Sequence, residues 1–389
     1  MPGLPPLKQR ERAILVGVCR TRLDRPEVEE HLEELGRLAE TAGADVAGTL
    51  VQERGALHAA TFLRPGKVQA LAELARGGGA DLAICDEDLS PAQVRNLEKE
   101  TGLRVLDRSA LILDIFARRA RTREARTQVE LAQLRYLLPR LTRQWTHLSR
   151  QEGGIGQRGV GETQLELDRR VIRHRIARLA RDLGSIEKER GERRKHRADA
   201  CVALVGYTNA GKTTLLNALT GAGAFVEDRL FATLDPLVRR AARGGPPPFL
   251  VIDTVGFIRK LPHHLVASFR STLEEAGEAD LLLHVLDASA PALEDQRRTA
   301  AAILDDLGLG LRPTLMVFNE VDRATPGILD RLRVEYPEAA FLSALDPADV
   351  RGLERRVRAL LALRAGLAAA RPSAPEDGDG RLAAAEPLT

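Results

Sequence analysis

The stretch Cys201–Leu219, CVALVGYTNAGKTTLLNAL, decides the fold of the second half of the chain. Its apolar start, Cys201–Val205, predicts a buried strand, and the amphipathic run Thr214–Leu219 predicts a helix. Between them, Gly206–Thr213 follows the pattern G-x-x-x-x-G-K-[ST], in which backbone N–H groups wrap a phosphate chain at a helix N-terminus. The stretch therefore predicts a phosphate-binding loop in an α/β domain.

Two side chains of this loop carry the expected chemistry. Lys212 can reach the β- and γ-phosphates and stabilise charge on the transferring group, and the Thr213 hydroxyl can ligate Mg²⁺. The nucleotide-binding residues predicted in the loop are Gly206, Tyr207, Thr208, Asn209, Ala210, Gly211, Lys212, Thr213 and Thr214.

A second buried strand, Phe249–Ile252, is followed by Asp253-Thr254-Val255-Gly256. Asp253 can hold Mg²⁺ directly or through water, and the N–H of Gly256 can meet the γ-phosphate. Between this segment and the loop lies Phe231-Ala232-Thr233-Leu234-Asp235. We expect Thr233 to close over Mg²⁺ and the γ-phosphate as a switch residue, although other threonines lie nearby.

Two later segments predict which base the bound nucleotide carries. Strand Pro313–Phe318 ends in Asn319-Glu320-Val321-Asp322, and the Asp322 carboxylate can accept the N1 and N2 protons of guanine, a pair that adenine lacks. Strand Ala340–Leu342 leads to Ser343-Ala344-Leu345, where a backbone N–H can meet the guanine O6. The order of these segments predicts a Mg²⁺-dependent GTPase that converts GTP and water to GDP and phosphate, rather than a P-loop ATPase or a metabolic kinase.

The first 118 residues alternate short apolar runs with amphipathic stretches, a pattern that predicts a small α/β domain with a mostly parallel sheet. No catalytic constellation stands out in it. Arg64–Lys67 could hold an anion at a helix start, but we favour an ordinary loop and helix cap.

Residues 119–198 hold 21 Lys and Arg against 10 Asp and Glu, a local net charge of +11 in a chain whose total is +3. Leucines at heptad spacing predict an antiparallel helical hairpin, with Pro139 kinking its first helix. Its glycine-rich tip, residues 153–161, has five glycines in nine residues. The candidate RNA contacts there are Arg150, Gly153, Gly154, Gly156, Arg158, Gly159 and Gly161. A solvated basic face and a plain connector remain the alternatives.

The G domain is expected over residues 199–364, and the tail, 365–389, is expected to be disordered from about residue 372. No stretch approaches the roughly 18 apolar residues of a membrane span. The three lone cysteines (Cys19, Cys85 and Cys201) have no metal-ligand spacing, which favours a reducing cytoplasm. We expect a monomer.

The chain resembles the HflX family of ribosome-associated GTPases, within the translation-factor-like class of P-loop GTPases. The resemblance rests on five segments: Asp107–Tyr136, Gln151–Arg170 (QEGGIGQRGVGETQLELDRR), Gly206–Thr214, Phe231–Pro236 and Asp253–Ile258. It implies binding to the large ribosomal subunit, with the tip directed toward the peptidyl-transferase region, and splitting or rescue of stalled ribosomes under stress. Related GTPases also use an Asn at the place of Asn209 to help hold K⁺, so K⁺ is a second candidate cofactor.

Three positions depart from related patterns. Glu320 replaces the Lys of N-K-x-D, and Val160 replaces the Pro of R-G-P-G-E-T. Phe257 stands where many GTPases place a water-orienting Gln, so another group, which the resemblance suggests the ribosome supplies, must orient the water. The alternative function is a nucleotide-gated RNA- or ribosome-binding protein whose hydrolysis is incidental.

Overall fold

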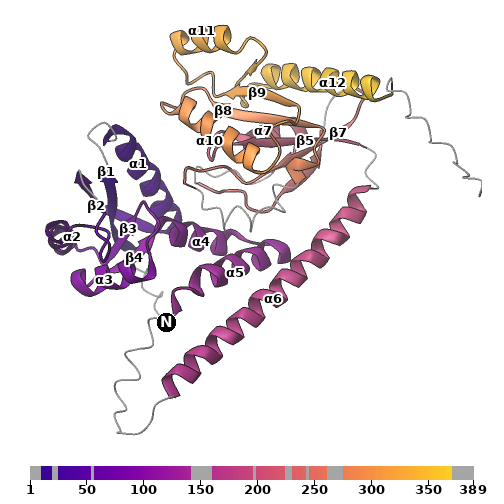
Figure 1. Ribbon diagram of the computed structural model, residues 1–389. Helices are drawn as coiled ribbons and strands as arrows, with labels where there is room; N and C mark the ends of the chain where they lie inside the picture. Colours follow the sequence, from indigo (N-terminus) through magenta and orange to yellow (C-terminus); the bar gives the residue numbers. More distant parts are fainter. Residues whose placement is uncertain are drawn as a thin grey trace, which may run out of the picture.

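The computed structural model describes residues 10–19, 25–53, 57–141, 160–195, 199–223, 230–241, 245–260 and 275–369. The tip contacts predicted at Arg150, Gly153, Gly154, Gly156, Arg158 and Gly159, and the tail predicted from residue 372, lie outside these ranges. Figure 1 shows the two α/β units joined by long helices.

The N-terminal unit is a four-stranded sheet in the order β2-β1-β3-β4, with every pair parallel. Central β1 alternates its side chains between two cores: Ala13 and Leu15 face α1 and α4, whereas Ile14 and Val16 face α2 and α3. The elements are β1 (Glu11–Cys19), α1 (Arg25–Ala42), β2 (Ala44–Glu53), α2 (Pro65–Gly78), β3 (Leu82–Cys85), α3 (Pro91–Thr101), β4 (Arg104–Asp107) and α4 (Arg108–Arg119).

The predicted hairpin is formed by α5 (Arg123–Leu137) and α6 (Val160–Lys195). Leu131, Leu179 and Leu183 are buried where the two helices pack, as the heptad spacing predicts. Figure 1 shows the long α6 running beside α5.

Two details of the hairpin prediction were wrong. Helix α5 ends at Leu137, so Pro139 follows the helix instead of kinking it. Proline lacks the N–H that a further helical turn would need, and its ring clashes with the carbonyl four residues earlier. Helix α6 begins at Val160, so Gly161 is helical rather than part of the loop. Glycine can adopt helical backbone angles, and its entropic cost of about 0.5–1 kcal/mol is small for a helix of 36 residues.

The second unit is a six-stranded sheet in the order β10-β9-β8-β5-β7-β6. All pairs are parallel except edge strand β6, which runs antiparallel to β7 and was not predicted. The elements are β5 (Ala200–Gly206), α7 (Lys212–Thr220), β6 (Leu237–Arg240), β7 (Phe249–Asp253), β8 (Leu281–Asp287), α10 (Leu293–Asp306), β9 (Thr314–Asn319), α11 (Pro326–Glu335), β10 (Ala340–Phe341) and α12 (Pro347–Ala369). The predicted α/β class with mostly parallel sheets is confirmed.

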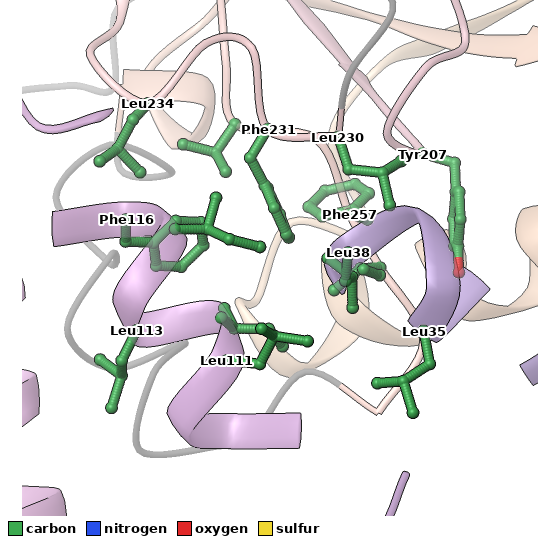
Figure 2. Packing of buried hydrophobic residues seen from close by; sticks show 14 of the residues in the cluster. Leu35, Leu38, Leu111, Leu113, Phe116, Tyr207, Leu230, Phe231, Leu234 and Phe257 are labelled. Carbon is green, nitrogen blue, oxygen red and sulfur yellow. The ribbon is translucent and has the colours of Figure 1, made fainter. Parts of the chain in front are cut away.

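One hydrophobic core is continuous between the two units. Helices α7 and α12 pack on the face of the second sheet that is turned away from the N-terminal unit. On the near face, Leu35 and Leu38 of α1 and Phe116 of α4 join Phe231 and Phe257 in the same cluster (Figure 2). Phe116 meets Phe231 edge to face, with ring centroids 4.7 Å apart. The segments predicted to sense the nucleotide therefore pack against the N-terminal unit.

Candidate nucleotide-binding site

The predicted phosphate loop lies where β5 passes into α7, at the carboxyl ends of the parallel strands. Gly211 occupies the left-handed region at φ 81°. A Cβ there would lie 2.2 Å from the Asn319 side-chain nitrogen, so only glycine fits. A cavity of about 60 Å³ is lined by Thr208, Asn209, Gly211, Lys212, Thr213, Thr214, Phe231, Ala232, Thr233, Thr254 and Gly256. The structure thus gathers predicted residues from three distant segments around one hollow.

Lys212 is buried at the floor of this cavity. Its Nζ donates to the backbone carbonyls of Gly206 at 3.1 Å and Tyr207 at 2.7 Å. Burial lowers the pKa of Lys212 to about 8, against the opposing influence of nearby Asp253. Because this ammonium group is fixed in place and poorly solvated, a phosphate oxygen would stabilise its charged form. This fits the role predicted for Lys212.

Three oxygens converge beside Lys212, as a magnesium site requires. The Thr213 hydroxyl lies 2.7 Å from Asp253 Oδ2 and 2.9 Å from the Thr233 hydroxyl, and Thr233 lies 3.1 Å from the same carboxylate oxygen. Asp253 Oδ1 is buried without a hydrogen-bond partner, and burial raises the pKa of this carboxyl group. An all-oxygen set with an unpaired carboxylate oxygen fits a hard cation.

In the part of the chain that the structure describes, no three His, Cys, Asp or Glu residues cluster as a metal cage. Magnesium at Thr213, Thr233 and Asp253 would share its coordination with phosphate oxygens and water, as Mg²⁺ sites in nucleotide-binding proteins do.

Gly256 presses directly against the phosphate loop. A Cβ on it would lie 2.7 Å from Thr208 Cα and 3.0 Å from Lys212 Nζ. The next residue holds the contact in place, because Phe257 N donates to the Gly206 carbonyl at 2.9 Å and Thr208 N donates to the Phe257 carbonyl at 2.7 Å. A γ-phosphate bound at Gly256 would therefore lie next to the hydrogen bonds that connect Phe257 with the phosphate loop.

The residues of 231–235 divide between two places. Phe231, Ala232 and Thr233 line the phosphate cavity, whereas Leu234 and Asp235 line only a neighbouring cavity, which Ala232 and Thr233 border too. The Asp235 carboxylate accepts from Arg121 N at 3.0 Å and from the Thr122 hydroxyl at 2.5 Å. Asp235 therefore stabilises the start of α5 and is turned away from the phosphates.

Asn319 ties the phosphate loop to the predicted base-binding loop. Its side-chain nitrogen donates to the Ala210 carbonyl at 3.1 Å, and its oxygen accepts from Ala344 N at 2.9 Å. Within the base-binding loop, Ser343 N donates to Asp349 at 2.9 Å, and Leu345 N donates to the Ser343 hydroxyl at 3.4 Å. The exposed Asp322 follows in the turn after β9, three residues after Asn319.

Glu320 lies close to the phosphate loop although it is not the expected lysine. Its carboxylate is 3.8 Å from the place of a Cβ on Gly211, and the residue is in the left-handed region at φ 60°. Burial and then Asp287 raise the pKa of Glu320, against an ion pair with Arg323. The mostly exposed Arg323 thus neutralises the carboxylate that stands where the family pattern has lysine.

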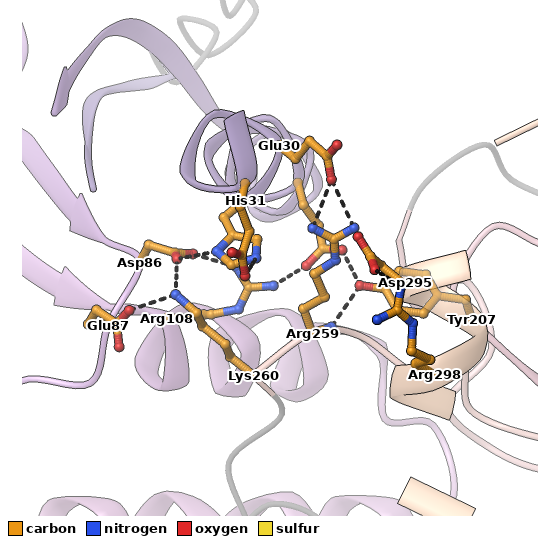
Figure 3. Close-up of polar contacts among 12 residues, drawn as sticks. Glu30, His31, Asp86, Glu87, Arg108, Tyr207, Arg259, Lys260, Asp295 and Arg298 are labelled. Carbon is orange, nitrogen blue, oxygen red and sulfur yellow. Dashed lines mark hydrogen bonds and ion pairs between the residues drawn. The ribbon is translucent and has the colours of Figure 1, made fainter. Parts of the chain in front are cut away.

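Sequence reasoning missed the part of the site that α1 contributes. The Tyr207 hydroxyl donates to Glu34, whose carboxylate also pairs with the buried Arg108. Beside them Arg259 donates to Glu30 at 3.1 Å (Figure 3). No local pattern signals these residues, because the acidic face of an amphipathic helix is normally solvated.

The phosphate loop, the oxygen cluster and the Asn319 link define the chain as a P-loop GTPase. Family models agree: residues 29–117 match "GTP-binding GTPase N-terminal", residues 119–197 match "GTP-binding GTPase Middle Region", and residues 201–320 match "50S ribosome-binding GTPase".

The chain belongs to the HflX family of GTPases, and the predicted family and GTP-hydrolysing activity are confirmed. It is 49% identical to GTPase HflX of Caldanaerobacter subterraneus subsp. tengcongensis, over 81% of this chain and 73% of that protein. Identity to GTPase HflX of Escherichia coli is 45%, over 87% of this chain and 80% of that protein. A solved complex of SsGBP with GDP is 25% identical with a TM-score of 0.49, covering 90% of this chain and 98% of that one.

Proposed function

We propose that this GTPase binds the large ribosomal subunit through its basic hairpin, and that it uses GTP to split or rescue stalled ribosomes in the cytoplasm. Magnesium, held by Thr213, Thr233 and Asp253, would accompany the nucleotide. The description "50S ribosome-binding GTPase" for the model matching residues 201–320 supports the partner. In the described part of the chain, no helix is long and apolar enough to cross a membrane.

The observation that carries the proposal is the exposed basic face of α6. Arg170, Arg173 and Arg178 are exposed there, and among the described residues they make no ion pair or hydrogen bond through their side chains. Arginines along a helix can contact successive phosphates of a folded RNA, positioning a protein without reading sequence. We propose that this face leads toward the predicted tip, whose residues 153–159 lie outside the described ranges.

Co-sedimentation with purified large subunits, together with GTP turnover, tests this function. Deleting residues 153–161 should abolish stimulation by the ribosome and leave nucleotide binding intact. Replacing Arg170, Arg173 and Arg178 with alanine should reduce the slope of log affinity against log salt by about 0.7–0.9 for each phosphate that is no longer neutralised. Alanines at Arg331, Arg351 and Arg355, exposed on the G domain, are the matched control. If ribosomes stimulated GTP turnover fully in the variant without residues 153–161, the tip would be only a connector.

The second candidate is a nucleotide-gated RNA-binding protein whose hydrolysis is incidental. Phe257 favours it, because this residue is 1% exposed and offers no group to orient water. Turnover that stays at background when subunits are added, with binding that still depends on GTP, would select this candidate.

A further inference from the structure

A second cavity, of about 380 Å³, lies next to the phosphate cavity, and Ala232 and Thr233 border both. Three arginines line it: Arg119 at the end of α4, Arg121 just before α5, and Arg239 on β6. Segments far apart in the sequence thus bring positive charge together beside the residue expected to act as a switch. We call this hollow the arginine cavity.

The arginine cavity has few negative charges to balance its arginines. Among the described residues that line it, Asp235 is the single carboxylate, and it already accepts hydrogen bonds from Arg121 N, Thr122 N and the Thr122 hydroxyl. The Arg239 guanidinium donates to a neutral group, the carbonyl of the neighbouring Val238, at 2.9 Å. Arg121 and Arg239 are both exposed, so an incoming group can reach them. Such a cavity favours an anion.

The arginine cavity lies at the base of the basic hairpin. Helix α5 begins at Arg123, two residues after Arg121, and α6 runs beside α5 (Figure 1). Helix α6 ends at Lys195, and Asp199 just beyond it pairs with Arg240, the neighbour of Arg239, at 3.2 Å. The basic face of α6 therefore leads toward the cavity, and an RNA that follows this face can extend to it.

The cavity is also close to the residues that would hold magnesium. Thr233 borders it, and the Thr233 hydroxyl lies 2.9 Å from that of Thr213 and 3.1 Å from Asp253. Arg121 and Arg239 approach the segment that carries Thr233 from two different elements. An anion bound between these like charges would reduce their repulsion and hold the segment in this position.

We propose that the arginine cavity binds a backbone phosphate of ribosomal RNA, and that this contact speeds GTP hydrolysis by holding Thr233 over the metal. The planar guanidinium groups of Arg121 and Arg239 suit two oxygens of one phosphate. The inference rests on the proposed ribosome binding and adds a contact with a different role. The hairpin supplies affinity, whereas the arginine cavity links the bound RNA to the reaction.

A double variant of the full-length protein, Arg121→Ala with Arg239→Ala, tests the cavity. It should still sediment with purified large subunits at low salt, because the arginines of α6 are intact. A partner contact that completes a GTPase site contributes about 10³-fold or more, and we expect turnover with subunits to fall by at least about tenfold. The slope of log affinity against log salt should fall by about 0.7–0.9, as expected for one phosphate.

Two further variants separate charge from folding. Arg121→Lys with Arg239→Lys keeps the charge and loses the paired donors, so it should restore the salt slope and part of the turnover. Arg331→Ala with Arg351→Ala, which removes two exposed arginines elsewhere on the GTPase domain, is the matched control and should respond to subunits as the wild type does. The Kd for GDP and the Tm of the double alanine variant should match those of the wild type.

The outcomes distinguish this inference from the proposed function. Full turnover with subunits in the double alanine variant, with sedimentation intact, would overturn the role of the cavity and leave ribosome binding standing. A wild-type protein that neither sediments with subunits nor responds to them would refute both. Inorganic phosphate that raised wild-type turnover equally without subunits would assign the cavity to a free anion instead of RNA. A lower Tm together with weaker GDP binding in the alanine variant would show a structural role and also overturn the proposal.

Discussion

Tyr207 of the phosphate loop donates its hydroxyl proton to Glu34 of α1, 173 residues away in the sequence. The same hydroxyl oxygen accepts from Arg259 N at 2.7 Å, three residues after Gly256. Burial and then Glu34 raise the pKa of Tyr207, so the hydroxyl remains protonated and able to donate. One phenol thus connects the phosphate loop, the segment after Gly256 and the N-terminal domain.

Replacing Tyr207 with phenylalanine should destabilise the docked arrangement of the two domains. The ring would still pack in the core, but the Arg259 N–H would lose its acceptor and Glu34 one donor. Leaving buried polar groups unpaired costs about 1–3 kcal/mol. Urea unfolding measures the change, with Tyr336→Phe as control, because the hydroxyl of Tyr336 reaches Glu294 only at 3.4 Å. Equal small changes in both variants would contradict this account.

Asp235 should contribute to stability through α5 rather than through nucleotide binding. Its carboxylate accepts from Arg121 N, Thr122 N and the Thr122 hydroxyl at the start of that helix. Losing such a cap costs about 0.5–2 kcal/mol, so Asp235→Ala should lower the Tm and leave the Kd for GDP unchanged. Asp295→Ala, which removes an exposed pair with Arg298, is the control. A weakened Kd without a change in Tm would return Asp235 to the nucleotide site.

Chemistry that depends on local spacing could be predicted from the sequence. The loop around Lys212 needs a strand, glycines and a helix in immediate succession, and the structure has them in that order. Thr213 and Asp253 could be paired in advance because each follows its own buried strand, and those strands are neighbours in the sheet. Parallel strands end at a common edge, so residues at their ends meet.

Contacts between domains could not be predicted in this way. Glu30 and Glu34 belong to a helix whose acidic face, read alone, indicates only solvent exposure. The face of α1 that docks on the GTPase domain is decided by the core that Leu38 shares with Phe257. These two residues are more than 200 positions apart in the sequence. Edge strand β6 was also missed, because its four residues include two exposed arginines and show no apolar run.

Asp322 should select guanine. Asp322→Asn replaces an acceptor of the guanine N1 and N2 protons with an amide that can donate to the 2-oxo group of xanthine. Competition binding should therefore show a lower preference for GTP over xanthosine triphosphate. The bonds of Asn319 to Ala210 and Ala344 do not involve Asp322, so the loops should keep their arrangement. An unchanged ratio of the two affinities would remove Asp322 from the base site.

Asn209 should make hydrolysis sensitive to potassium. Its exposed side chain lies at the mouth of the phosphate cavity, and it makes no hydrogen bond to any described residue, which disfavours the alternative that it merely orders the loop. A K⁺ ion held by this amide would add positive charge to an active site in which Phe257 offers no polar group. Turnover should therefore rise when K⁺ replaces Na⁺ at equal ionic strength, by less than the ~10³-fold of an arginine finger.

Two variants isolate the amide of Asn209. Asn209→Ala removes it, but the residue sits at φ 63°, where alanine is strained by about 1–2 kcal/mol. Asn209→Gly removes it without that strain. Both variants should lose the difference in turnover between the two salts, because each lacks the amide that would hold the ion. Equal wild-type rates in K⁺ and Na⁺, with and without ribosomes, would exclude the ion.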